Sequence, residues 1–308
     1  MKRSGEKAIQ ADVTLVEKIE IGGAVQTRQM GVILDLPSGA KGNVEGIVGY
    51  PFLKNYVVQI DYLAKKVRFL TPAQFSPDPK ASVLPMSIRM NIPEISARID
   101  GVEGKVRVDT GYSGTLSFTS PTVRKNALEA KYPKRVETVL GQGVGGVTKG
   151  TATRIGALEL GDISLPGVIT GLSADKSGAL ADSETIALLG GEVLSRFTVT
   201  LDYPGKRFFL TRNADFVKPF IFARAGFSGI LEGDGYRILT VAPEGPAAEV
   251  GMKENEQILT LDGAPMGQLG LSGLRESLRR AVGTKVTATV RAADGQTRTI
   301  VLILRDLL

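Results

Sequence analysis

The sequence contains no cysteine and no histidine among its 308 residues. Without these side chains the chain cannot use a Cys or Ser–His nucleophile system, a histidine proton shuttle, or a thiolate or imidazole zinc site. Any acid–base chemistry therefore falls to Asp, Glu, Lys or Tyr, among which carboxylates are the commonest choice.

Long apolar runs and basic clusters are missing as well. No apolar segment approaches the roughly 20 residues of a membrane-spanning helix, and the N-terminal segment MKRSGEKAIQADV lacks the apolar core of a signal peptide. The 38 basic and 32 acidic residues give a net charge of +6 but are mixed along the chain. These absences argue against a membrane span and against nucleic-acid binding.

Length and composition favour a globular protein of about two domains. A hydrophobic content of 43%, a charged content of 23% and 37 glycines are typical of a folded chain rich in turns and strands. We therefore expect a mainly β fold.

An internal repeat organises the first two thirds of the chain. IEIGG of residues 19–23 returns as LELGD of residues 158–162, and residues 47–71 (IVGYPFLKNYVVQIDYLAKKVRFLT) return as residues 188–211 (LLGGEVLSRFTVTLDYPGKRFFLT). Both copies predict alternating strands and one short helical turn, at PFLKNY and at EVLSRF. A proline-containing connection over residues 71–85 separates them.

Only the second copy is preceded by two further strands, over residues 93–118, which meet at a turn around Asp100 and Gly101. The second of these strands ends in the motif VRVDTGYSGT and delivers Asp109 into a tight turn. Gly111 lets the backbone approach the carboxylate, and the Thr110 hydroxyl can support the turn. The pattern predicts a rigidly held carboxylate at Asp109, with Thr110 and Gly111 as its turn.

The triplet Asp-Thr-Gly is weak evidence alone, but its surroundings are specific. Apolar residues precede it, Ser113 and Gly114 follow it, and a hydrophobic-hydrophobic-Gly segment lies downstream at residues 187–190. Together these motifs resemble the retropepsin and pepsin families of aspartic peptidases over residues 83–212. The resemblance implies a β-barrel acid-protease lobe that hydrolyses peptide or protein substrates without a metal or cofactor. It also implies that Asp109 is the catalytic carboxylate, in a catalytic motif completed by Thr110 and Gly111.

A glycine-rich hairpin is predicted between these two elements, over residues 140–161. Its place in the order resembles the flap of the same families, a mobile hairpin that closes over bound peptide. The resemblance implies that Gly143, Gly145 and Gly146 form its tip, where missing side chains permit bending.

The resemblance also implies a second aspartate, because these peptidases share one proton between two facing carboxylates. The sequence has no second Asp-Thr-Gly or Asp-Ser-Gly, and Asp61 and Asp202 fit a structural turn better. Three explanations stay open: an N-terminal truncation of a two-lobed protein, a homodimer in which each chain contributes Asp109, and a binding protein that has lost catalysis.

The region from about residue 213 has a different pattern, with strands at GFSGIL, YRILTVA and EQILTLDG and a helix over residues 272–281. From Gly226 onward it resembles a bacterial PDZ domain. The resemblance implies binding of protein C-termini by β-augmentation. The loop that would receive the carboxylate comprises Gly226, Phe227, Ser228 and Gly229. For Leu274 and Leu278 on the helix we expect core packing.

Three segments are therefore expected: an incomplete repeat lobe over residues 1–72, a retropepsin-like lobe over residues 83–212, and a PDZ domain over residues 213–308. The expected activity is that of an aspartic endopeptidase. The alternatives are an inactive or truncated peptide-binding adaptor and a structural envelope protein assembled through the exposed half-lobe. The resemblance implies a bacterial envelope or periplasmic location, although the N-terminus shows no signal peptide.

Overall fold

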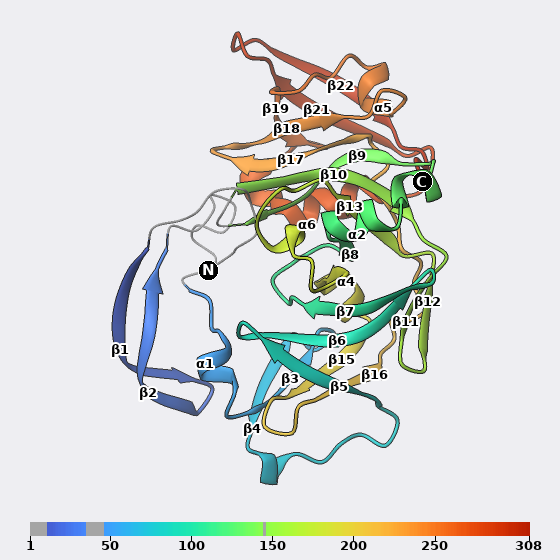
Figure 1. Cartoon of the computed structure of the whole chain (residues 1–308). Helices are drawn as coiled ribbons and strands as arrows, with labels where there is room; N and C mark the ends of the chain where they lie inside the picture. Colours follow the sequence, from blue (N-terminus) through green and yellow to red (C-terminus); the bar gives the residue numbers. More distant parts are fainter. Residues whose placement is uncertain (1–10, 35–45, 144–145) are drawn as a thin grey trace.

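The computed structural model describes residues 11–34, 46–143 and 146–308, and within them the chain is mainly β (Figure 1). The described strands form three sheets, none of which closes into a barrel. The mainly β prediction is confirmed, whereas the closed barrel implied by the resemblance is not present in this part, because the strands follow an open path.

The N-terminal sheet is a hairpin of two long strands, β1 (Asp12–Ile21) and β2 (Ala24–Ile33). Gly22 and Gly23 form its turn with φ values of 54° and 84°, which glycine adopts without strain. In Figure 1 the hairpin projects from one side of the molecule. Of its hydrophobic side chains only Ala24 is buried.

The largest sheet begins with strands from both copies of the repeat. Its first five strands, in spatial order, are β4 (Lys66–Leu70), β3 (Val57–Asp61), β15 (Phe197–Asp202), β16 (Arg207–Arg212) and β5 (Ser82–Arg89). All four pairings are antiparallel. The predicted connection over residues 71–85 is therefore shorter than expected, because its last four residues belong to β5 and pair with β16.

The same sheet continues into the strands around the Asp-Thr-Gly motif. They are, in spatial order, β6 (Ile92–Ile99), β7 (Val102–Val108), β14 (Ala187–Leu189), β8 (Leu116–Phe118), β13 (Ile169–Ser173), β10 (Gly146–Arg154) and β9 (Val136–Gly143). Strands β11 (Ala157–Leu160) and β12 (Ile163–Pro166) pair with each other, and β11 also pairs with β6. The predicted turn between β6 and β7 is confirmed at Asp100 and Gly101, both with positive φ.

Short helices connect these strands. They are α1 (Tyr50–Leu53), α2 (Ser120–Lys125), α3 (Leu128–Lys131), α4 (Gly191–Leu194) and the 3₁₀ turns η2 (Pro72–Gln74) and η3 (Ala179–Ala181). Helices α1 and α4 occupy matching positions in the two copies, as predicted. Within the described part of the chain, no helix is long and apolar enough to cross a membrane.

The third sheet contains the C-terminal strands β17 (Phe227–Glu232), β18 (Gly235–Val241), β19 (Gln257–Leu261), β20 (Ala264–Pro265), β21 (Lys285–Arg291) and β22 (Thr297–Ile303). Helices α5 (Pro246–Glu249) and α6 (Met266–Leu278) accompany it. We call these elements together the C-terminal unit. Helix α6 starts and ends earlier than predicted, and Gly270, with φ 60° and ψ −174°, breaks it.

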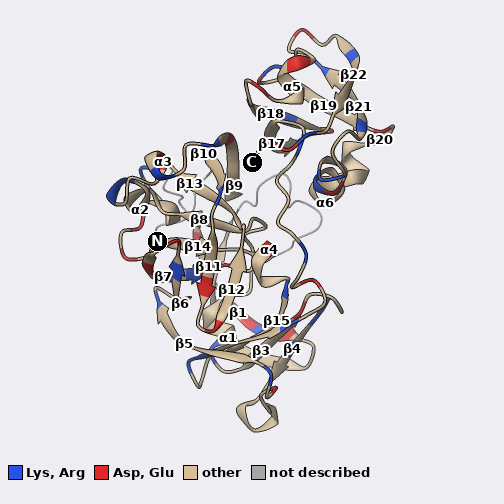
Figure 2. Cartoon of the chain, turned by 90° about the vertical axis from the view of Figure 1, so that its right-hand side faces the viewer, with Lys and Arg blue, Asp and Glu red and all other residues tan. Residues whose placement is uncertain are grey.

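The buried hydrophobic side chains form two main cores. One lies under the large sheet and includes Ile95, Phe118 and Phe197, and the other lies inside the C-terminal unit and includes Ile238 and Ile258. Lys and Arg are interspersed with Asp and Glu over the described chain (Figure 2).

The segment between the two cores is held by one arginine. The Arg196 guanidinium donates to the carbonyls of Asp215, Phe216, Lys218 and Pro219, and it lies 3.6 Å from the centre of the Phe220 ring. Residues 213–220 are therefore fixed against the large sheet rather than free in solvent.

The pairing register confirms the repeat. Eight of the nine bridges of the β1–β2 hairpin have a counterpart, at one constant shift in numbering, among strands β10 to β13. Matching pairs are Val13–Val32 with Ala152–Gly171, Leu15–Met30 with Arg154–Ile169, and Ile19–Gln26 with Leu158–Leu165. The repeat therefore extends beyond the segment that sequence similarity marks.

The two copies also meet around a local two-fold axis. Strand β3 pairs with its counterpart β15, and Gln59 lies opposite its own counterpart, Thr200. The Gln59 amide donates to the Thr200 hydroxyl at 3.4 Å. The flanking pairs are Val58–Leu201 and Ile60–Val199, as a two-fold arrangement requires.

Candidate functional site

Asp109 lies directly after β7, where the strand turns away from the sheet. Its amide donates to the Leu189 carbonyl at 3.0 Å, which fixes the backbone against β14. One carboxylate oxygen accepts hydrogen bonds from the amides of Gly111 at 2.9 Å and Tyr112 at 3.1 Å. The carboxylate is therefore held by its own turn while remaining half-buried rather than enclosed.

Strand β14 lies between β7 and β8, parallel to the first and antiparallel to the second. The segment after it follows the Asp109 turn closely. The amides of Gly190, Gly191 and Glu192 donate to the carbonyls of Thr115, Tyr112 and Gly114 at 2.8, 2.6 and 3.0 Å. A Cβ at Gly190 would overlap the Gly114 carbonyl, so this crossing needs glycine. The hydrophobic-hydrophobic-Gly segment thus lies against the turn.

Of the predicted turn residues, Gly111 contacts the carboxylate through its amide, whereas the Thr110 side chain is exposed. The hydroxyl that ties the turn to the sheet belongs to Thr115, which is buried and donates to the Ile169 carbonyl. Sequence reasoning missed this role, since nothing local distinguishes one threonine of the motif from the other.

Tyr112 is a second residue that sequence reasoning missed. Its hydroxyl lies 2.8 Å from the Ser117 hydroxyl, and its ring packs with Leu140, Leu180 and Leu188. Burial raises the pKa of Tyr112, so the phenol stays neutral. A large aromatic side chain directly after Asp-Thr-Gly could have indicated this packing role. In the structure it joins the Asp109 turn to β9.

Strands β9 and β10 form the predicted glycine-rich hairpin, with Gly143 opposite Gly146 at its end. Gly146 has φ 119°, a conformation that favours glycine. Gly145, the third predicted tip residue, lies outside the described residues. Leu140 and Gly141 of β9 lie against the Tyr112 ring, so the structure brings the hairpin and the Asp109 turn together.

A buried charge cluster lies behind the turn. Arg107, two residues before Asp109, is 5% exposed and pairs with Asp182 at 2.9 Å and with Glu94 at 3.9 Å. Arg89 pairs with the same two carboxylates. Burial alone would raise the pKa of Asp182, but the Thr185 hydroxyl and the guanidiniums of Arg107 and Arg89 hold it below its ordinary value. The cluster anchors β7 under the candidate site.

The predicted carboxylate-binding loop of the C-terminal unit begins with Gly226, at φ 78°, whose backbone packs against that of Gly245. Phe227 is buried against Tyr236, with ring centres 6.1 Å apart. Burial raises the pKa of Tyr236 to about 12, although a hydrogen bond from the Gly229 amide opposes this rise. Strand β17 is an edge strand of its sheet.

Leu274 and Leu278 of α6 are both buried in the core of the C-terminal unit, which confirms their expected packing. Asp61 and Asp202 also have the structural role that was expected. Each accepts a hydrogen bond from the amide three residues on, and Asp202 pairs with Arg207 at 2.7 Å.

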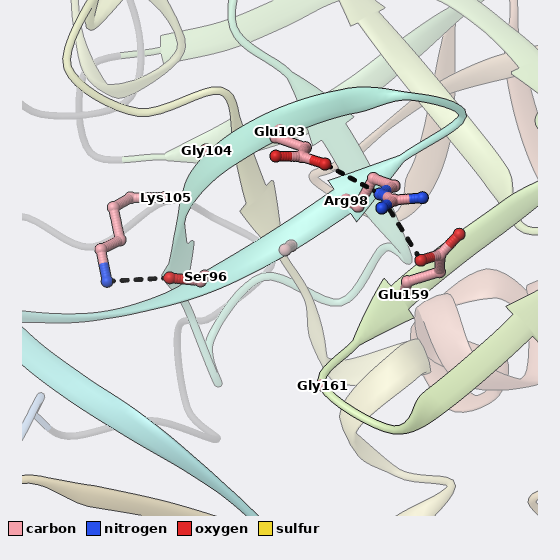
Figure 3. Close-up of a pocket in the computed structure, with 8 residues that line it drawn as sticks. Ser96, Arg98, Glu103, Gly104, Lys105, Glu159 and Gly161 are labelled. Carbon is pink, nitrogen blue, oxygen red and sulfur yellow. Dashed lines mark hydrogen bonds and ion pairs between the residues drawn. The ribbon is translucent and has the colours of Figure 1, made fainter.

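A shallow depression elsewhere on the surface gathers charged side chains over β6, β7 and β11 (Figure 3). Arg98 pairs with Glu103 at 2.9 Å and with Glu159 at 3.7 Å, and Lys105 donates to Ser96. These charges satisfy one another, and Asp109 is not among the lining residues. Among the described residues no group of acidic side chains could hold a metal ion.

Comparisons with known proteins give little beyond this geometry. No protein-family model matches the sequence, and no curated protein matches it. A photosystem II D1 C-terminal processing protease is 26% identical over 27% of this chain and 23% of its own, with a TM-score of 0.26.

Two further solved structures are similar to parts of the chain. A retropepsin-like aspartic protease from Rickettsia conorii is 19% identical over 42% of this chain and 89% of its own, with a TM-score of 0.30. Basic 7S globulin from soybean is 9% identical over 51% of this chain and 50% of its own, with a TM-score of 0.29. TM-scores this low do not indicate a function.

Proposed function

We propose that this chain is an aspartic peptidase in which Asp109 is a catalytic carboxylate. The observation that carries the proposal is the geometry of the turn: two amides hold one oxygen of Asp109, and the 189–191 segment crosses directly beside it. A carboxylate fixed by backbone donors at the end of a strand has the preorganisation that catalysis requires. The hairpin β9–β10 packs on this turn through Tyr112, as a substrate-covering element would.

The proposed reaction is hydrolysis of a peptide bond by an activated water. One ionised carboxylate takes a proton from the water as its oxygen attacks the carbonyl carbon, while a second, protonated carboxylate donates a hydrogen bond to the carbonyl oxygen. Collapse of the tetrahedral intermediate breaks the C–N bond, and the departing nitrogen takes the proton that the first carboxylate accepted from the water.

The second carboxylate is proposed to come from another copy of the chain. Among the described residues, no second carboxylate is hydrogen-bonded to Asp109. A dimer in which each copy contributes Asp109 would supply the pair. Specific activity should therefore rise with protein concentration until the dimer is saturated.

The deciding experiment is cleavage of a mixed peptide library between about pH 4 and 7, the range in which coupled carboxylates work, by the wild type and by Asp109→Ala. We expect cleavage that the substitution abolishes. Asp202→Ala, which removes a carboxylate from a structural turn, is not a clean control because it costs stability. Asp294→Ala, on an exposed C-terminal turn, is the matched control and should cleave normally. Equal cleavage by wild type and Asp109→Ala would refute the proposal.

The C-terminal unit is proposed to be a PDZ domain spanning residues 213–308, next to a peptidase lobe over residues 83–212 and an incomplete repeat over residues 1–72. The position of β17 at the edge of its sheet, beside the Gly226 turn, supports binding of an extended peptide as an added strand. Fluorescence anisotropy with peptides ending in a free carboxylate tests this. Amidated versions of the same peptides should bind at least tenfold more weakly, since the amide removes the charge that the loop amides receive.

A further inference from the structure

The C-terminal unit contacts the loop that carries Asp109. The Arg275 guanidinium of α6 donates to the Ser113 hydroxyl at 2.7 Å and approaches the Ser113 carbonyl at 3.4 Å. Ser113 lies four residues beyond Asp109 on the same turn. In both overall views α6 lies on the side of the C-terminal sheet that faces α4 (Figures 1 and 2). One side chain of the C-terminal unit therefore holds the middle of the candidate catalytic loop.

A second arginine, directly after α6, holds the segment that crosses this loop. Arg279 pairs with Glu192 of α4 at 2.9 Å, and both side chains are largely shielded from solvent. The Glu192 amide in turn donates to the Gly114 carbonyl. The two arginines, four residues apart, thus contact the Asp109 turn at Ser113 and the segment that crosses it at Glu192.

The hairpin β9–β10 is tied to the same unit. The Val139 amide donates to the Ser228 hydroxyl at 2.7 Å, and the Lys149 ammonium donates to the Leu239 carbonyl at 3.0 Å. Ser228 also lies 2.6 Å from the Thr240 hydroxyl, so its orientation is fixed. All three parts of the candidate site, the turn, the crossing segment and the hairpin, therefore have a partner in the C-terminal unit.

We propose that Arg275 is a positioning residue for the Asp109 turn, and that the C-terminal unit thereby sets the activity of the candidate site. The inference rests on the proposed peptidase function. Arg275 holds Ser113 rather than the carboxylate, so it acts through the geometry of the turn and not on the reacting atoms. Charge-assisted hydrogen bonds are about twice as strong as neutral ones, so this contact is suited to fixing a loop.

The same contacts connect the two proposed activities. Ser228 belongs to the loop that would receive a peptide carboxylate, and its hydroxyl is the acceptor for β9. A peptide added along β17 therefore binds beside the bond that holds the hairpin. Occupation of the C-terminal unit is thereby coupled to the hairpin, which packs on the Asp109 turn through Tyr112.

Hydrogen exchange tests the positioning role without requiring catalysis. Arg275→Gln should speed amide exchange over residues 111–115 by roughly tenfold, the loss expected for one hydrogen bond to a charged group. Arg280→Gln is the matched control, because Arg280 lies two residues after the same helix but pairs with Asp262 inside the C-terminal unit. Equal exchange in the two variants would overturn the proposal, whether or not the chain cleaves peptides.

Kinetics then separate positioning from general destabilisation. Arg275→Gln should lower kcat by roughly tenfold with KM little changed, and Arg275→Lys should restore part of the loss, because a cation can still reach Ser113. In a double-mutant cycle, adding Ser113→Ala to Arg275→Gln should cost little more than either change alone. Fully additive losses in kcat would contradict a direct contact between Arg275 and Ser113. An inactive wild type would refute the peptidase proposal, but the hydrogen-exchange result would still test the positioning role.

Discussion

The hairpin β1–β2 and the strands β10 to β13 share one pairing register but lie in different surroundings. Val13 and Met30 of the first are 63% and 67% exposed, whereas their counterparts Ala152 and Ile169 are buried. The second copy is covered because β6 pairs with β11 and β8 pairs with β13. The first copy has no such strands in the described part of the chain. An alternating pattern therefore sets which residues pair, but the neighbouring strands set whether they are buried.

The largest expected effect comes from the charge cluster beneath β7, which has no counterpart in the described part of the first copy. Asp182→Asn removes the partner of two guanidiniums and leaves Arg107 buried with Glu94 alone, at a cost of about 3 kcal/mol or more. Because the folded-state pKa of Asp182 lies below the ordinary value of 3.8, its contribution is complete above that value and is lost as the pH falls through the folded pKa.

Urea denaturation of wild type and Asp182→Asn at pH 7 and near pH 3 measures this difference. The gap in the free energy of unfolding should be large at pH 7 and narrower at the lower pH. A constant gap at both pH values would show that the carboxylate charge is not what stabilises β7.

The next effect compares one position in the two copies. Leu158, 0% exposed, lies where the first copy has Ile19, which is only half-buried. Leu158→Ala should cost about 2–5 kcal/mol because it leaves a cavity in the core, whereas Ile19→Ala should cost about 1 kcal/mol or less. Thermal or chemical denaturation checks both. Equal costs would mean that the first copy is covered in solution.

The smallest effect is expected on the exposed face of β1–β2. Replacing Met30 with Gln should change the free energy of unfolding by no more than about 0.5 kcal/mol, since little of the side chain leaves water on folding. Ile169→Gln, at the matching position, should destabilise by several times as much. A large decrease in the free energy of unfolding from Met30→Gln would show that Met30 is buried by further contacts in solution.

Local features were predictable from sequence because their causes are local. The strands of both copies, the short helices after Gly49 and Gly190, and the turn at Asp100–Gly101 all appear as expected. The two segments that were predicted to accompany Asp109, the hydrophobic-hydrophobic-Gly segment and the glycine-rich hairpin, both contact its turn. The catalytic, hairpin and carboxylate-loop assignments remain predictions, as do the segment boundaries.

Other parts of the candidate site could not be predicted, because they depend on residues far apart in the chain. Alternation along VRV would place Arg107 on a solvent face, yet Asp182 and Glu94 make its burial possible by neutralising its charge. Tyr112 gains its role only from Leu140 on β9. Arg275, 162 residues from Ser113, gave no signal at all.

By itself the sequence determined the mainly β fold and the repeat, and it limited any acid–base chemistry to Asp, Glu, Lys and Tyr. Hydrophobic alternation, glycine turns and the absence of cysteine and histidine can all be read from the sequence without knowing which distant residues are in contact. The tertiary structure alone decided which copy of the repeat is buried and which side chains hold the Asp109 turn. Those outcomes depend on burial and on pairing between distant segments. The two copies share one pairing register, and that register does not decide which of them is covered by neighbouring strands.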